Sequence, residues 1–266
     1  MDLAAYAARI GYSGAFRADI ATLRALHLAH ATHIPFENID VLMGRTPELD
    51  VESLERKLIY AGRGGYCYEQ NTLFAAVLEE CGFTVTRLAA RVRWGAPAGA
   101  VRPRTHMLLA VEAEGEAHVA DVGFGGDGLL LPIPLRPGEP ARQFAWEYRI
   151  VAEGAGCVLQ SVRPEGWLDL YQFTLEPQYP ADYQVANWYT STHPNSVFRS
   201  MLRVQLPGPE TRLMLVNRTL TETTVAGSRE TAIADDRDLL GILEEKFGLS
   251  FPEGTRIPFA ETAKTA

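Results

Sequence analysis

The sequence has few cysteines and no long apolar run, and both features exclude whole classes of protein. Only three of its 266 residues are cysteines, Cys67, Cys81 and Cys157, and three scattered cysteines cannot build a disulfide framework. No Cys-x-x-Cys or His-x-x-x-His pair has the spacing of metal ligands, so we expect no metal. No apolar run approaches the roughly 18 residues that span a bilayer, and Asp2 stands where a signal peptide would be positive. These features predict a cytoplasmic protein with no membrane partner.

Positive charge is also scarce. The chain has 33 acidic side chains against 25 lysines and arginines, a net charge of −8. This balance gives no general attraction for nucleic acid and leaves room only for a local basic cleft that binds a phosphorylated ligand. Apolar residues make up 47% of the chain and charged residues 22%, as in ordinary globular domains. The length allows one large domain, or two to three interlocked subdomains.

The N-terminal third of the chain has mainly helical spacing of its apolar residues. Three aspartates precede such stretches and can cap a first turn: Asp2, Asp19 and Asp50. Residues 33–50 are loop-like in composition. A further helix is predicted to begin near Tyr66 and to end at Gly82, a residue suited to a left-handed helix end.

From Thr84 the pattern changes to short stretches that are rich in β-branched and aromatic residues and are divided by Gly or Pro turns. They are "TVTRLAARVRW", "THMLLAVEA", "AHVADVGFG", "FAWEYRIVA" and "GWLDLYQFTL". This pattern predicts an antiparallel barrel or a strongly curved sheet. A helical segment ("PADYQVANWYTSTHP"), further strands ("MLRVQL" and "TRLMLVNRTLTETTV") and an amphipathic helix ("DDRDLLGILEEKFGL") follow. The sequence therefore predicts an α+β fold.

The stretch "RGGYCYEQN" (63–71) places Cys67 in the first turn of a predicted helix. Unpaired N–H groups and the positive end of the helix dipole favour a thiolate there. We expect Gly64 and Gly65 to let a substrate carbonyl approach the sulfur and to leave N–H groups free as oxyanion donors. The alternative is a buried, inert cysteine, which is the interpretation we favour for Cys81 and Cys157.

A reactive cysteine needs a base, and His106 is the histidine best placed to supply it. If Glu114 and Gly115 form the turn of its hairpin, Asp121 faces Leu108 and is the diagonal neighbour of His106, about 7 to 8 Å away. Such an aspartate would orient the imidazole. A one-residue slip in register would reverse this conclusion, and the alternative is an edge-strand histidine paired with a surface carboxylate.

The other histidines fit the role of base less well. His27 and His30 are expected to be partly exposed residues of a helix. His118 is expected on the face of the hairpin opposite to Asp121, because side chains alternate along a strand.

Together these segments resemble the arylamine N-acetyltransferase family. The resemblance covers most of the chain, in the family's order: "IPFENID" (34–40), "RGGYCYEQN" (63–71), "RTHMLLAV" (104–111), "DVGFGG" (121–126) and "NWYTSTHPNSVF" (187–198). It implies an N-terminal helical bundle (1–83) that carries the cysteine, a central antiparallel β-barrel (84–185) that carries the histidine and aspartate, and a C-terminal α/β lid (186–266). It also implies a papain-like cysteine triad of Cys67, His106 and Asp121.

The activity that the resemblance implies is two-step acetyl transfer. Acetyl-CoA, the co-substrate, would acetylate the cysteine, which would then pass the acetyl group to an aromatic amine, hydrazine or hydroxylamine. The resemblance implies that Phe36, Val92 and Phe124 line the acceptor site; packing in the core is the alternative for each. No nucleic acid or membrane partner is implied, and a homo-oligomer is compatible with the sequence.

The remaining site residues are expected to bind CoA or to support the site. Thr105, Gly125 and Gly126 resemble the family's CoA contacts, with backbone N–H groups for the pyrophosphate, although the two glycines are equally explained as turn residues. Glu37, Arg63 and Asn71 are expected to be structural supports. An ion pair between Arg63 and Glu37 would fix the "PFEN" loop against the cysteine helix; two surface charges are the alternative.

Two other functions fit the same residues. An amide synthase or an acyl-thioester hydrolase would use the same triad with a different acceptor. A non-catalytic module that binds CoA or an aromatic ligand would not need an intact triad, and the presence of Cys67, His106 and Asp121 argues against it.

Overall fold

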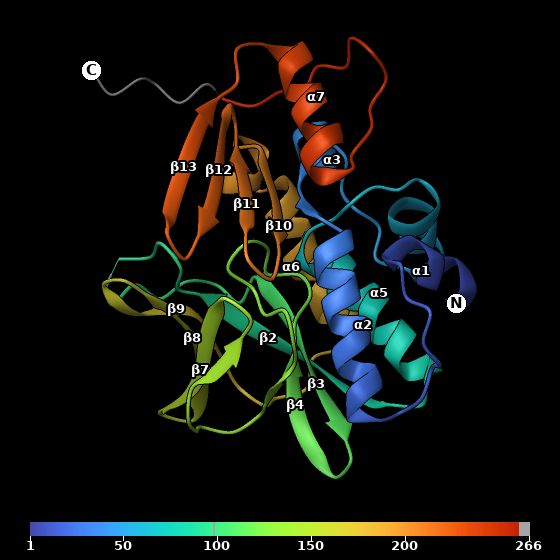
Figure 1. Cartoon of the computed structure of the whole chain (residues 1–266), viewed down its shortest axis with the longest axis vertical. Helices are drawn as coiled ribbons and strands as arrows, with labels where there is room; N and C mark the ends of the chain where they lie inside the picture. The colour runs from blue at the N-terminus through green and yellow to red at the C-terminus, as the bar shows by residue number, and fades with distance from the viewer. Residues whose placement is uncertain (98, 261–266) are drawn as a thin grey trace.

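The computed structural model describes residues 1–97 and 99–260, which form helices and two antiparallel sheets (Figure 1). The N-terminal helices are α1 (Leu3–Ile10), α2 (Ile20–His33), α3 (Ile39–Leu42), α4 (Val51–Leu54), a π-helical turn (Glu55–Tyr60) and α5 (Cys67–Glu80). The three predicted caps are confirmed: the side chains of Asp2, Asp19 and Asp50 accept hydrogen bonds from backbone N–H groups of the first turns. The predicted bounds of the cysteine helix are correct to within two residues, and Gly82 has a φ of 90°.

The larger sheet has eight strands in the order β5-β4-β3-β2-β9-β8-β7-β6 and is nearly closed into a barrel. Its strands are β2 (Thr84–Val92), β3 (His106–Ala113), β4 (Glu116–Ala120), β5 (Ile133–Pro134), β6 (Ala141–Gln143), β7 (Trp146–Glu153), β8 (Gly156–Arg163) and β9 (Gly166–Phe173). The strands predicted from Thr84 onward are therefore confirmed, and so is the predicted α+β class with its curved antiparallel sheet.

The smaller sheet has five strands in the order β1-β10-β11-β12-β13. They are β1 (Phe36–Glu37), β10 (Arg203–Pro207), β11 (Arg212–Val216), β12 (Thr219–Thr224) and β13 (Gly227–Ala232). Helix α6 (Pro180–Thr192), a short 3-10 turn (Val197–Arg199) and α7 (Asp236–Phe247) complete the C-terminal part. Figure 1 shows the smaller sheet above the larger one, with α7 at its far end.

Strand β1 connects the N-terminal helical part of the chain to the C-terminal sheet. The stretch 33–50, which was expected to be a loop, contains β1 and α3. Strand β1 forms because Phe36 pairs with Gln205 of β10 on one side and bridges Gly65 on the other. This pairing depends on residues far away in the sequence, so local composition did not reveal it. The division at 83/84 and 185/186 stays a prediction; α6 runs across the second boundary.

Two clusters of buried apolar side chains hold the elements together. The larger one joins α1, α2 and α5 to the inner face of the eight-stranded sheet, and the smaller one joins α3, β10 to β12 and α7. No helix within the described residues is long and apolar enough to cross a membrane.

Candidate active site

Cys67 is the first residue of α5, as the sequence predicts, and its side chain is almost fully buried. The backbone N–H of Tyr66, the cap residue, donates to Glu69 Oε2 at 3.0 Å, which fixes the start of the helix. The first-turn N–H groups therefore surround the sulfur with positive partial charge.

The two glycines before Cys67 have a different role from the one that we expected. A Cβ at Gly64 would lie 2.1 Å from Pro35 O, and a Cβ at Gly65 would lie 2.8 Å from Glu69 Oε2. The Gly65 N–H donates to Pro35 O. These glycines therefore allow two backbone segments to approach closely, and the expectation that they leave open space and that the Gly65 N–H is a free donor is wrong.

His106 and Asp121 meet as the hairpin predicts. Leu109 pairs with Ala120 and Val111 with His118, which is the register that a Glu114-Gly115 turn requires. His106 Nε2 lies 2.7 Å from Asp121 Oδ2, and both side chains are buried.

The carboxylate of Asp121 is held in place by two further groups. Its Oδ1 accepts hydrogen bonds from Asn71 Nδ2 at 2.9 Å and from the Gly123 N–H at 3.0 Å. Asn71 in turn donates to Met107 O and accepts from the Val122 N–H. Burial alone would raise the pKa of Asp121, but the charge of His106 and these donors outweigh it and lower the pKa.

The imidazole of His106 has a raised pKa. Burial lowers it, yet the charge and hydrogen bond of Asp121, followed by contact with Cys67, raise the pKa to about 10. Because Nε2 is taken by Asp121, Nδ1 is the nitrogen left for the thiol. Cys67 Sγ also lies 3.7 Å from Thr105 O, beside the first residue of β3. The arrangement supports a thiolate–imidazolium pair.

His27 belongs to this network, which the sequence did not indicate. It was expected to be partly exposed, as was His30, but both are fully buried because α2 is packed between α1 and α5. His27 Nδ1 lies 3.0 Å from Leu130 O, and Nε2 accepts the Asp121 N–H at 3.0 Å. Burial lowers the pKa of His27 to about 4, so the ring is neutral and fixes the Asp121 backbone.

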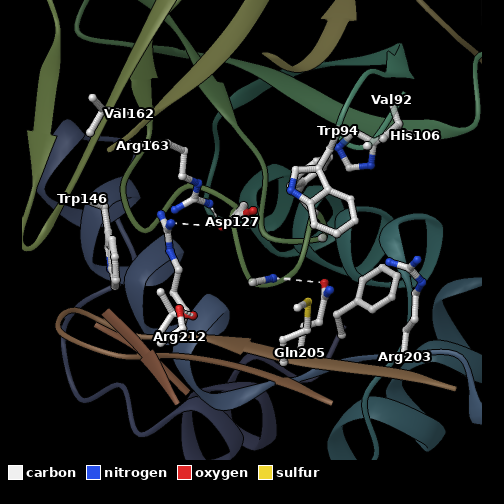
Figure 2. A pocket seen from close by; sticks show the side chains of 18 of the residues that line it. Val92, Trp94, His106, Asp127, Trp146, Val162, Arg163, Arg203, Gln205 and Arg212 are labelled. Atoms are coloured by element: carbon white, nitrogen blue, oxygen red, sulfur yellow. Dashed lines mark hydrogen bonds and ion pairs between the residues drawn. The ribbon is translucent and has the colours of Figure 1, made fainter. Parts of the chain in front are cut away.

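A cavity of about 910 Å³ opens over the thiol, between the two sheets (Figure 2). Of the predicted residues, those that line it are Cys67, His106, Phe36, Val92, Phe124, Thr105 and Gly126. The Phe124 ring lies edge-on to His106, with centroids 5.2 Å apart. Gly125 does not line the cavity. It has a φ of 91°, and a Cβ at this position would lie 1.9 Å from Gln205 Oε1.

Several lining residues were missed in the sequence, because five of them come from strands whose facing sides depend on how the two sheets meet, and two, Trp94 and Asp127, come from turns. They are Trp94, Asp127, Trp146, Arg163, Arg203, Gln205 and Arg212. Figure 2 shows Arg203 and Gln205 on the strand below the cavity, and Arg163, Asp127, Arg212 and Trp146 toward the other end. The alternation in "RVQL" places positions 203 and 205 on one face of β10, the one signal that the sequence offered.

The expected contact between Arg63 and Glu37 is present, with Arg63 Nη2 2.6 Å from Glu37 Oε1. Glu37 also accepts the Ile39 N–H, and Arg63 reaches Asp40. Lys57 bridges Asp40 and Glu69 at 2.6 Å each. This partly buried group of charges connects the β1 loop to the start of α5.

Comparison with known proteins gives consistent results. A family model described as N-acetyltransferase matches residues 19–255. The chain is 43% identical to an arylamine N-acetyltransferase of Escherichia coli over 246 residues, 92% of this chain and 87% of that protein. It is 40% identical over 232 residues (86% and 82%) to a Salmonella typhimurium protein named arylamine N-acetyltransferase / N-hydroxyarylamine O-acetyltransferase. The structure of Mycobacterium marinum arylamine N-acetyltransferase in complex with CoA superposes with a TM-score of 0.90 at 37% identity, covering 93% of this chain and 92% of that one.

Proposed function

The chain belongs to the arylamine N-acetyltransferase family, and from this premise we propose that Cys67, His106 and Asp121 carry out its acetyl transfer. The enzyme is an acyltransferase that uses acetyl-CoA as co-substrate and arylamines as acceptors. The observation that supports the triad is that the buried cysteine at the α5 N-terminus lines the same cavity as an imidazole that Asp121 holds at 2.7 Å.

In the first step the Cys67 thiolate attacks the thioester carbonyl carbon and a C–S bond forms. First-turn N–H groups of α5 stabilise the oxyanion. The intermediate collapses when the bond to the CoA sulfur breaks, and the His106 imidazolium gives its proton to the leaving thiolate. The products are acetyl-Cys67, free CoA and a neutral His106.

In the second step the acceptor nitrogen attacks the acetyl carbon. Neutral His106 takes a proton from that nitrogen, and the bond to Cys67 Sγ breaks, which restores the thiolate–imidazolium pair. Weakly basic arylamines suit this step because they are uncharged nucleophiles near pH 7. Hydrazines and hydroxylamines offer a similar nitrogen or oxygen.

Phe36, Val92 and Phe124 form the acceptor wall in this proposal, since all three line the cavity beside Cys67. Thr105 and Gly126 contact CoA on the same cavity. Gly125 allows the turn that precedes Gly126. The Gly126 N–H donates to Gln205 Oε1 at 3.1 Å, so it would bind the pyrophosphate only if this hydrogen bond were exchanged. Glu37, Arg63 and Asn71 act as supports through the contacts described above.

We further propose that the enzyme works on small molecules in the cytoplasm and has no nucleic acid or membrane partner. Three free cysteines and a net charge of −8 support this. A homo-oligomer is compatible with this proposal.

Mass spectrometry after brief exposure to acetyl-CoA tests the proposal. The wild-type protein should gain one acetyl group, and Cys67→Ala should gain none. Cys81→Ala, a control at the opposite end of the same helix, should behave like wild type. Release of CoA should then depend on added arylamine. Continuous release without amine would indicate a hydrolase, and an unmodified wild-type protein would indicate a binding module.

A further inference from the structure

Helix α6 has apolar side chains on its solvent face as well as on its buried face. Ala181, Val185 and Trp188 are spaced by four and three residues, so their side chains project from one side of the helix. All three residues are exposed, and the large ones, Val185 and Trp188, are 70% and 62% exposed. A surface helix normally turns a polar face to water. This apolar solvent face therefore indicates a partner that covers it.

The exposed apolar residues continue in the segment just before the helix. Leu175 is 57% exposed, and Tyr179, the cap residue of α6, is 65% exposed. Single exposed apolar residues are normal on a protein surface, but a cluster that is rimmed by polar groups marks a site of interaction. The name α6 surface is used below for Leu175, Tyr179, Ala181, Val185 and Trp188.

The two ends of the α6 surface carry charges of opposite sign. Glu176 and Asp182 are exposed at the N-terminal end. At the C-terminal end, Arg199 Nη1 donates to the backbone oxygen of Thr192, the last residue of the helix, at 3.0 Å. Asp182 and Arg199 form no ion pair with another side chain in residues 1–97 or 99–260. A complementary partner therefore presents positive charge to the first end and negative charge to the second.

A second copy of the chain meets this requirement better than the C-terminal segment does. The described part of the chain ends at Ala260, whose N–H donates to Ser200 O, next to Arg199. The residues that follow, "ETAKTA" (261–266), include no large apolar side chain that could bury Trp188. A second copy brings the same apolar surface and, when it is turned end to end, the reversed order of charges.

We propose that the α6 surface is the contact of a two-fold symmetric dimer, in which α6 of one copy packs antiparallel to α6 of the other. Such an isologous contact uses the same patch on both subunits. Residues 182 and 192 are equally far from 187, so a two-fold axis beside Trp188 places Asp182 opposite Thr192 of the partner subunit. Arg199 of the partner subunit lies there, and the antiparallel helix dipoles attract each other as well.

Trp188 is the expected anchor of the contact, because buried aromatic residues at the centre of an interface carry most of the binding energy. An interface of standard size buries about 800 Å² on each partner, so Leu175 and Tyr179 take part beside the helix face. Within the described chain, no residue of the α6 surface lines the cavity over Cys67. The dimer and the proposed acetyl transfer are therefore tested separately.

Sedimentation velocity tests the dimer. At about 50 µM protein, wild type should sediment as a dimer, since even weak interfaces of standard size bind in the micromolar range. Trp188→Ala should raise the dissociation constant by about 30-fold. Tyr60→Ala is the matched control, because Tyr60 is 63% exposed and lies outside the α6 surface; it should change the constant by less than about twofold. A monomeric wild type, or equal constants for wild type and Trp188→Ala, would overturn the proposal.

Charge reversal tests the antiparallel arrangement. Asp182→Arg and Arg199→Asp should each weaken the dimer by about 10-fold, because like charges then face each other at both ends. An equimolar mixture of the two variants should recover the wild-type dissociation constant to within about threefold, since opposite charges face each other again. This recovery also shows that both variants fold. A mixture that binds no more tightly than either variant alone would overturn the proposal.

A chain that ends at Ala260 tests the C-terminal segment as the alternative occupant. This shorter chain should dimerise as the full chain does. Loss of the dimer on removal of residues 261–266 would assign the contact to that segment and overturn the proposal.

Discussion

At the scale of single residues, the reactivity of Cys67 depends on a charge that His106 keeps over a wide pH range. Because the pKa of His106 is raised to about 10 while Cys67 is unacetylated, the ring of the free enzyme is protonated throughout the neutral range. Its interaction with Asp121 contributes stability that is fully present below pH 6.5 and is lost as the pH rises through 10.

Alkylation of Cys67 by iodoacetamide at pH 6 tests this charge. His106→Ala and Asp121→Ala should each slow the reaction, by on the order of 100-fold for His106→Ala, because an ordinary cysteine has little thiolate at pH 6. Exposed His33→Ala is the control. A rate unchanged in His106→Ala would mean that the helix terminus alone activates the sulfur.

His27 provides the opposite pH dependence. Its pKa is lowered from 6.5 to about 4, so the unfolded chain takes up a proton before the folded one does. Stability should fall by about 3 kcal/mol as the pH drops from 6.5 to 4, and His27→Gln should remove this part of the acid sensitivity. Urea titrations at several pH values measure it; an identical acid profile in the variant would contradict the prediction.

The triad was predictable at this scale, whereas its support was not. The hairpin turn set the register that brings His106 to Asp121, and this information is local. The role of His27 depends on the packing of α2 against α5 and the 121–130 loop, which no spacing within α2 encodes.

At the scale of elements, the start of α5 is anchored by a buried carboxylate. Burial raises the pKa of Glu69 to about 7 although Lys57 opposes the shift. Lys57→Met should therefore leave Glu69 without its cation and lower the free energy of unfolding by about 3 kcal/mol. Thermal unfolding measures the change, with exposed Arg56→Met as the control. Equal melting temperatures for the two variants would refute the anchor.

The turn after β4 offers a sharper comparison. Gly125→Ala forces a Cβ into a backbone with φ 91° and against Gln205, whereas a Cβ at Gly126 would meet nothing closer than 3.9 Å. We expect Gly125→Ala to cost about 2 kcal/mol of stability and Gly126→Ala to cost much less. Chemical denaturation of both variants decides between this account and one in which the two glycines are equivalent.

At the scale of the whole molecule, the sequence predicted the succession of helices, curved sheet and mixed C-terminal part, because each has a distinct local periodicity. It did not predict that β1 completes the C-terminal sheet, or that the cavity walls come from both sheets. Those features arise from pairings such as Phe36 with Gln205, whose partners are too far apart for local patterns to reveal.

The two-residue strand β1 has a consequence for how new specificities can arise. Gly65, Phe36 and Gln205 lie in three neighbouring backbone segments, so the nucleophile and the floor of the acceptor site are built on one hydrogen-bonded frame. A shift of the β10 backbone would displace β1 and, through the Phe36–Gly65 bridge, the start of α5. It would therefore impair the reaction with every substrate. We therefore expect the acceptor preference to change through substitution of cavity-lining side chains such as those at positions 203 and 205, and not through movement of the β10 backbone.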